Sequence, residues 1–328
     1  ADDADRSFYQ YAYPLLQMLF KRMSKRESEE QHRLSYLLGQ AASKLGNYEE
    51  AIKALNKAYQ LDSTHLPSLL ELAAAYYETQ EWDKAFKFYQ MLLVHHRDSL
   101  DREQITDIFY RLGVIKREQG ERRKSLNMFD KALEEDPNHR PTLQAVVGLY
   151  DKQKDWEQVI HFKKQILEVA EDDDERVKLL EEIGDLWNEK LKNQQKAIQS
   201  YSDATLIKPE DHRLLHKLLM AYQETKQWEK AIETIEQIAA LADRPQAKAK
   251  YIYTTGVITR DELKDPDTAI EKFNEALDID SDQLKAFEAI NKILTQKKDW
   301  KNLERNYRKM LHRWATGRLL SPFLPVLG

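Results

Sequence analysis

Apolar residues are spaced along the chain as they are in helices, and no segment alternates apolar and polar residues long enough to predict a strand. Small and large apolar residues recur in similar order, as in Leu38-Gly39 followed by Ala51, Leu55 and Ala58. Small residues let two helix backbones approach closely, and large ones fill the remaining space. The pattern therefore predicts an all-α chain of antiparallel helix pairs joined by short turns.

Glycines and tryptophans mark a repeat in this pattern. Each forms a series with intervals of 71 to 74 residues: Gly39, Gly113, Gly184 and Gly256, and Trp82, Trp156, Trp228 and Trp300. Because the two series interleave with one stride, the unit is a pair of similar repeats of about 36 residues each. The segments Leu191-Lys192-Asn193 and Leu263-Lys264-Asp265 each suggest one extra residue in a turn, where an insertion changes no packing face.

The repeats also carry the small and aromatic residues of a known pattern. The glycine-bearing repeats continue with an aromatic residue and then an alanine, as in Phe129 and Ala132 or Tyr201 and Ala204. Half the stride is close to 34 residues. Over about residues 32–314 the chain resembles the tetratricopeptide repeat family, and its alternating repeats resemble the long bacterial members. This resemblance implies an all-α, right-handed superhelical solenoid of about eight helix pairs.

Other residues predict where the helices meet and end. Gly46 and Gly120 are expected to end first helices, and Pro137 and Pro209 to stop second helices. The tryptophans recur in register with the turn, so we interpret them as packing residues. The space between one repeat and the next is expected to be filled by large residues of the second helices: Phe129, Tyr201 and Phe273.

The pattern divides the chain into three parts. Residues 1–31 predict an N-terminal capping helix, residues 32–316 the solenoid, and residues 317–328 an apolar tail interrupted by prolines. The N-terminal helix is amphipathic and basic toward its end, so a membrane surface or a partner protein is an alternative to capping. For the tail, three interpretations stay open: folding back over the last repeat, continuation of a longer array, or self-association.

Composition narrows the function classes. The chain has 51 Lys+Arg against 56 Asp+Glu, a net charge of −5, which argues against nucleic-acid binding. The absence of cysteine excludes disulfides, thiolate metal sites and cysteine nucleophiles. No apolar run reaches the roughly 18 residues of a membrane span. The acidic start lacks a signal peptide's layout, which favours the cytoplasm and leaves the periplasm open.

A search for catalytic and metal-binding motifs is negative. The chain has no glycine-rich phosphate loop, no His-Glu-x-x-His zinc motif and no Gly-x-Ser-x-Gly motif. His212 and His216 lie four residues apart beside Asp211 but lack a clear third ligand. The acidic run at 171–175 lacks a calcium loop's spacing and is expected to cap a helix. We therefore expect no enzyme activity, no cofactor and no metal.

The resemblance implies a concave groove, lined by the first helices, in which peptides lie. Mapping the family's inward positions onto this chain gives a candidate peptide-binding set: Arg33, Tyr36, Gln40, Tyr77, Tyr110, Arg111, Arg117, Asp185, Asn188, His216, Tyr253 and Arg260. Tyrosine and arginine are residue types that anchor interfaces. The hypothesis is a ligand with its negative end at the N-terminal arginines and its positive end at Asp185.

The resulting prediction is a non-catalytic protein-interaction scaffold or adaptor that binds a peptide or partner segment. No lysine occupies the position at which some family members hold a chaperone's C-terminal carboxylate, so that role is not supported. Two alternatives stay open. One is a subunit that self-associates through its N-terminal helix or its C-terminal tail, and the other is a peptide-sensing regulator.

Overall fold

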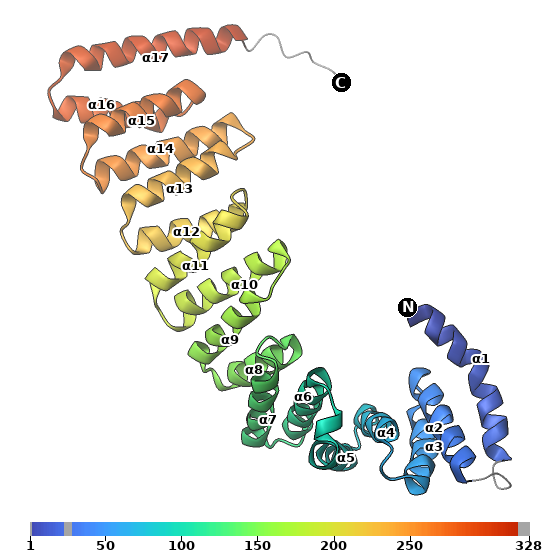
Figure 1. Cartoon of the computed structure of the whole chain (residues 1–328). Helices are drawn as coiled ribbons and strands as arrows, with labels where there is room; N and C mark the ends of the chain where they lie inside the picture. The colour runs from blue at the N-terminus through green and yellow to red at the C-terminus, as the bar shows by residue number, and fades with distance from the viewer. Residues whose placement is uncertain (1, 23–27, 321–328) are drawn as a thin grey trace. The chain divides into compact units, whose positions relative to one another are not determined.

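The computed structural model describes the backbone of residues 2–22 and 28–320, with the side chains of residues 7–22 and 28–315. In this part of the chain every regular element is helical, and eight antiparallel helix pairs follow a single N-terminal helix (Figure 1). The predicted all-α solenoid of helix pairs is thereby confirmed. The chain divides into two compact units, Ala1–Val169 and Ala170–Gly328. Residues 321–328 of the predicted tail lie outside the described residues.

Unit 1 contains the N-terminal helix and four pairs. The N-terminal helix is α1 (Asp2–Lys21). The first helices of the pairs are α2 (Ser28–Lys44), α4 (Leu66–Glu78), α6 (Arg102–Glu118) and α8 (Arg140–Gln153). The second helices are α3 (Tyr48–Leu61), α5 (Trp82–His95), α7 (Arg122–Glu135) and α9 (Trp156–Glu168). A short 3₁₀ helix, η2 (Arg97–Ser99), separates the second pair from the third.

Unit 2 contains the other four pairs. Their first helices are α10 (Asp173–Asp185), continued by the π-helical turn η3 (Leu186–Lys190), and α12 (His212–Glu224), α14 (Pro245–Asp261) and α16 (Leu284–Gln296). The second helices are α11 (Gln194–Ile207), α13 (Trp228–Ala240), α15 (Pro266–Ile279) and α17 (Trp300–Leu320). Within the described residues, no helix combines the length and the apolar character that a membrane crossing needs.

Every pair turns at a residue with left-handed backbone geometry. Gly46 and Gly120, with φ of 79° and 74°, occupy this position as predicted. In the other six pairs a lysine or glutamine occupies it, a substitution that the sequence did not reveal: Gln80, Lys154, Lys192, Lys226, Lys264 and Lys298. Backbone hydrogen bonds across the turn, rather than the residue type, therefore hold this conformation in most pairs.

The two predicted turn insertions are visible in these hydrogen bonds. In turns without an insertion, an N–H donates to the carbonyl five residues earlier, as from Glu121 to Lys116 over 2.8 Å. In the fifth and seventh pairs the corresponding bond spans six residues, from Asn193 to Trp187 and from Asp265 to Thr259. Each insertion thus widens the end of a first helix by one residue and leaves the packed faces in register.

The recurring glycines lie beneath a large side chain of their own pair. A Cβ atom at Gly39, Gly113 or Gly184 would lie closer than 3.0 Å to the side chain opposite. At Gly256 it would lie 2.6 Å from the ring of Phe273. The sequence predicted that Phe129, Tyr201 and Phe273 fill the space between repeats, but each ring covers the glycine of its own pair. The reason is that the glycine leaves a gap on the first helix which only this ring is placed to fill.

Connections between pairs follow the predicted helix boundaries. Pro137 and Pro209 come directly after α7 and α11, as predicted. Asp172 in the acidic run caps α10, accepting a hydrogen bond from the Glu175 amide over 2.9 Å. Trp82 packs edge-on against Tyr77 at 5.6 Å between ring centroids. Trp300 is largely exposed on α17, so the packing interpretation does not extend to it.

Candidate functional site

In unit 1, two predicted tyrosines each meet a histidine at the start of the next first helix. Tyr36 lies edge-on to His65, with ring centroids 5.1 Å apart, and Tyr110 lies edge-on to His139 at 5.5 Å. Both the tyrosines and the histidines are 74 residues apart, the stride of the glycines. The same contact is therefore built twice, on the first-helix face of the first and third pairs.

The two histidines hold the start of their helices. His65 Nδ1 lies 2.7 Å from the Ser68 hydroxyl, and His139 Nδ1 lies 2.7 Å from the Thr142 hydroxyl. Burial, together with the neighbouring His32, lowers the pKa of His65. The sequence analysis did not single out these histidines, although their interval equals the repeat stride and could have identified them.

Tyr77 and Arg111 form the centre of the same surface. The Arg111 guanidinium lies over the Tyr77 ring at 4.9 Å. Its Nε donates to Asp107 over 2.7 Å, and its Nη1 lies 3.8 Å from Glu78. Burial raises the pKa of Tyr77. The structure thus brings the two predicted residues together and shows that carboxylates of this chain already pair with Arg111.

The remaining predicted residues of unit 1 are more peripheral. Arg117 pairs with the adjacent Glu118 at 2.9 Å. Gln40 donates to the Tyr36 hydroxyl over 3.1 Å, and Arg33 is exposed on α2. The surface therefore offers three partly exposed tyrosines and balanced charge rather than a basic patch. A carboxylate arriving at Arg111 would compete with Asp107.

In unit 2 the equivalent surface is an ion-pair network. The Lys217 ammonium lies 2.7 Å from both Glu181 and Asp185, and the Tyr201 hydroxyl donates to Asp185 over 2.8 Å. Arg213 adds a second contact to Glu181 at 2.9 Å. Burial opposes the charged form of Lys217, but hydrogen bonds to Asp185 and Glu181 raise its pKa. The predicted negative end at Asp185 is thus paired within the chain.

Other predicted residues of unit 2 have separate neighbours. Asn188 accepts a hydrogen bond from Gln194 over 2.8 Å, and His216 is exposed on α12. Tyr253 lies 5.5 Å from the Phe273 ring. Arg260 makes two 2.7 Å hydrogen bonds to Asp261. The structure does not gather these four around one point.

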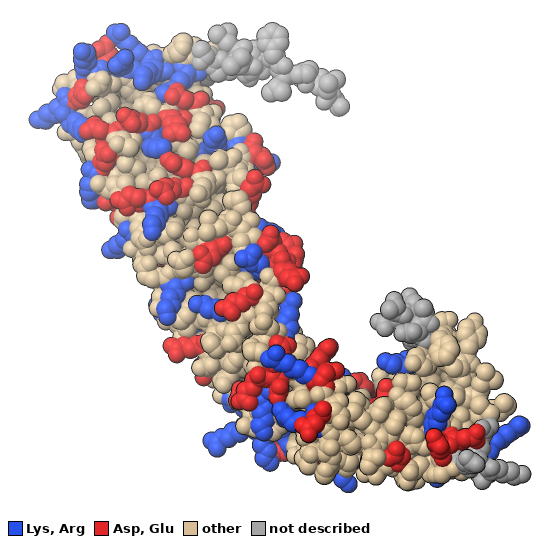
Figure 2. All heavy atoms as spheres, viewed as in Figure 1, with Lys and Arg blue, Asp and Glu red and all other residues tan. Residues whose placement is uncertain are grey.

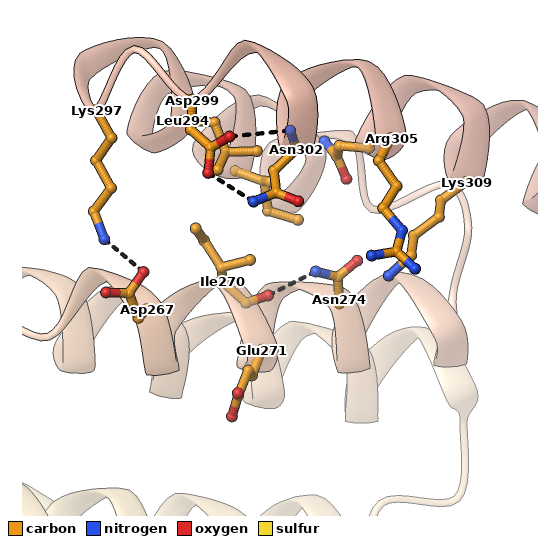
Figure 3. A pocket seen from close by; sticks show the side chains of 12 residues that line it. Asp267, Ile270, Glu271, Asn274, Leu294, Lys297, Asp299, Asn302, Arg305 and Lys309 are labelled. Carbon is orange, nitrogen blue, oxygen red and sulfur yellow. Dashed lines mark hydrogen bonds and ion pairs between the residues drawn. The ribbon is translucent and has the colours of Figure 1, made fainter.

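Unit 2 also contains a cleft that none of the predicted residues lines. It has a volume of about 280 Å³ and an apolar floor that includes Ile270, Ile290 and Leu294. Figure 3 shows Arg305 and Lys309 reaching from α17 toward α15. A 2.5 Å pair between Lys297 and Asp267 lies across one end of the cleft. Because the cleft lies between two second helices, a search restricted to first-helix positions could not find it.

Metal and charge patterns add little to these surfaces. Within the described residues, no three or more histidine, aspartate or glutamate side chains lie together so as to hold a metal ion. Asp211, beside His212, instead caps α12 by accepting from the Arg213 and Leu214 amides. Figure 2 shows both signs of charge mixed over most of the visible face, with lysine and arginine gathered over α17.

Family models match two parts of the chain. Both are described as tetratricopeptide repeat, one over residues 19–103 and the other over residues 106–139. A curated relative, Superkiller protein 3 of Schizosaccharomyces pombe, is 23% identical over 296 residues, covering 76% of this chain. This chain spans only 21% of the length of that relative.

Solved structures of repeat proteins are also similar. The C-terminal part of a tetratricopeptide repeat-containing protein from Cytophaga hutchinsonii is 19% identical, with 78% of this chain and 99% of that chain covered and a TM-score of 0.43. A tetratricopeptide repeat protein from Parabacteroides merdae is 16% identical, with 81% and 99% covered and a TM-score of 0.42.

Proposed function

We propose that this chain, which is a tetratricopeptide repeat protein, binds an extended segment of a partner protein on the first-helix face of unit 1. Repeats of this family generally serve as protein-interaction scaffolds, and the finer assignment rests on the residues of this chain. The observation that carries it is the row of Tyr36, Tyr77 and Tyr110, one on each of three successive first helices.

These tyrosines suit the role of interface anchors. Each is partly buried and each ring touches a neighbour that restricts its motion: His65, Arg111 and His139. An aromatic ring that is already held loses little conformational entropy when a partner covers it. The hydroxyls and the flanking carboxylates Glu78 and Asp107 supply hydrogen-bonding groups around them.

The ligand that this surface favours differs from an acidic-tailed peptide. Because Asp107 and Glu78 already pair with Arg111, a carboxylate of the ligand gains little unless it displaces them. We therefore propose that apolar and aromatic contacts to the tyrosines supply most of the affinity, and that Arg111 and Arg117 set orientation.

The scaffold is proposed to be non-catalytic. The charged groups of both first-helix faces are largely engaged with each other, Arg111 with Asp107 and Lys217 with Asp185. A general acid or base needs a proton position that is open to a substrate. Groups held in such pairs are better suited to shaping a surface than to transferring protons.

A displayed library of short linear peptides, selected on the full chain, tests the proposal. Selected peptides are expected to lose at least tenfold in affinity for Tyr77→Ala/Tyr110→Ala, because hot-spot tyrosines typically contribute about 2 kcal/mol. The matched control is Tyr59→Ala, a tyrosine of the second helix α3 that contacts Phe88. Circular dichroism verifies that the variants are folded.

Two results would count against this function. Peptides that bind the double variant as tightly as the wild-type chain would remove the tyrosines from the site. A loss of the same size for Arg111→Ala/Arg117→Ala alone, restricted to acidic peptides, would return the site to the charge-based hypothesis.

A further inference from the structure

Exposed apolar side chains are concentrated on two helices. In the described part of the chain, twelve large apolar side chains are exposed, and eight of them lie on α1 and α17: Phe8, Tyr11, Leu15, Met18, Trp300, Tyr307, Leu311 and Trp314. Single exposed apolar residues are normal on a protein surface, but contiguous stripes usually mark an interaction surface. Each helix therefore requires its own explanation.

The inner face of α1 is already in use. Gln17 Nε2 donates to Glu50 on α3 over 2.8 Å, and the Tyr13 hydroxyl donates to the same carboxylate. Tyr13 also packs against the apolar core of unit 1. These contacts orient the helix, so that its opposite face is turned away from the repeats.

The outer face of α1 carries a regular apolar stripe. Phe8, Tyr11, Leu15 and Met18 are spaced by three, four and three residues, which places them on one side of the helix. Tyr11 is 79% exposed and Leu15 is 61% exposed, although they form the middle of the stripe. Both are therefore available to a partner.

The spacing of this stripe is unchanged when the helix is reversed. An antiparallel copy centred on residue 13 would set Phe8 opposite Met18, and Tyr11 opposite Leu15. The same register would set position Asp5 opposite position Lys21, which have opposite charges. A two-fold interface needs a surface that is complementary to itself in this way. We propose that α1 pairs antiparallel with α1 of a second copy of this chain.

The stripe on α17 lacks this self-complementarity. An antiparallel copy of α17 centred on Tyr307 would set Lys301 opposite Arg313, and Arg305 opposite Lys309. Like charges placed opposite each other oppose association. The concentration of lysine and arginine over α17 is visible in Figure 2. Charge thus selects α1, and not α17, as the helix that pairs with itself.

The α1 pair is a small interface. The stripe spans ten residues, about 15 Å of helix. This is short beside a standard interface, which buries about 800 Å² on each partner. The dimer is therefore weak, and its population rises with protein concentration. This self-association is separate from the proposed peptide binding, because the stripe and the tyrosine row lie on different surfaces of unit 1.

Analytical ultracentrifugation of the full chain over a wide concentration range tests the pairing. The wild-type chain is expected to shift from monomer to dimer as concentration rises, and Tyr11→Asp/Leu15→Asp to stay monomeric. The matched control is Val94→Asp/Leu206→Asp, at positions that are 73% and 80% exposed but belong to neither stripe. A second control is Tyr307→Asp/Leu311→Asp on α17. Both controls are expected to dimerise like the wild-type chain.

Disulfide trapping tests the antiparallel register. The chain contains no cysteine, so Phe8→Cys and Met18→Cys each introduce a single thiol. The two positions are about 15 Å apart along one helix. An equimolar mixture is expected to form the mixed disulfide, whereas neither variant alone links to itself.

Three results would overturn the proposal. The first is a wild-type chain that remains monomeric at all concentrations, and the second is a dimer that survives Tyr11→Asp/Leu15→Asp. The third is self-linking of Phe8→Cys, which would indicate a parallel pair or a different contact. Peptide binding measured on the same Tyr11→Asp/Leu15→Asp variant is expected to be unchanged, so failure of the dimer and failure of the peptide site are separate observations.

Discussion

Units 1 and 2 use the same packing with different chemistry on the first-helix face. Three residues before the recurring glycine, unit 1 has Tyr36 and Tyr110, whereas unit 2 has Glu181 and Tyr253. In unit 1 this position meets a histidine ring, and at Glu181 it meets Arg213 and Lys217. Beneath both, a large side chain covers the glycine. The buried side of a first helix is thus constrained by packing, and the exposed side is free to vary.

The largest effect is expected at the shared packing contact. Gly113→Val in unit 1 and Gly184→Val in unit 2 would drive a side chain into Phe129 or Tyr201 and lower the free energy of unfolding by about 3 kcal/mol. Urea denaturation measures the loss, and hydrogen exchange assigns it to a unit. If only one unit responds, the two units do not share the contact.

The control for this prediction is a glycine without a partner side chain. A Cβ added at Gly148 on α8 would meet nothing within 4 Å. Gly148→Ala is therefore expected to be neutral, or to stabilise the chain by up to about 1 kcal/mol, because alanine is the better helix former. A loss comparable with that of Gly113→Val would show that the effect is not one of overpacking.

A smaller effect should separate the two units. Glu181→Gln removes the charge that meets Lys217 and Arg213, and we expect a loss of about 2 kcal/mol, limited by the exposure of Arg213. At the equivalent position of unit 1, Tyr110→Phe keeps the ring and is expected to change stability little. Urea curves at low and high salt measure both.

Salt provides the diagnostic for this pair of variants. The effect of Glu181→Gln is expected to shrink as sodium chloride is raised, since salt screens partly exposed charges. The effect of Tyr110→Phe is expected to be independent of salt. Equal salt dependence of the two variants would contradict an ionic surface in unit 2 and an aromatic one in unit 1.

The smallest effect concerns pH and is confined to unit 1. The pKa of His65 is lowered by burial and by His32, with Asp62 acting in the opposite direction. The unfolded chain therefore binds this proton more readily than the folded chain. His65 lowers stability as the pH falls through its ordinary pKa, near 6.5, and has no such effect above it.

His65→Asn tests this pH dependence. Asparagine can still cap α4 but does not titrate, so the decline in stability below pH 6.5 is expected to become shallower. Thermal unfolding between pH 7.5 and pH 5 measures the slope. His216→Asn, at an exposed position of α12, is the matched control. An unchanged slope in His65→Asn would assign the pH dependence to other groups.

Sequence determined the parts of this protein that depend on local spacing. The number of helix pairs, the helix ends at Gly46, Gly120, Pro137 and Pro209, and the two turn insertions all follow from residues close to one another in the chain. Each is a property of a single turn or a single repeat. A periodic pattern therefore predicts it without knowledge of which helices become neighbours.

Only the tertiary structure decided which charges and rings meet. Arg111 and Asp185 were predicted as open charges, yet Arg111 pairs with Glu78 and Asp185 with Lys217, residues 33 and 32 positions away in the sequence. Likewise, the tyrosine–histidine contacts join one repeat to the next. Such contacts depend on the distance between neighbouring helices and on side-chain rotamers, and repeat spacing does not contain that information.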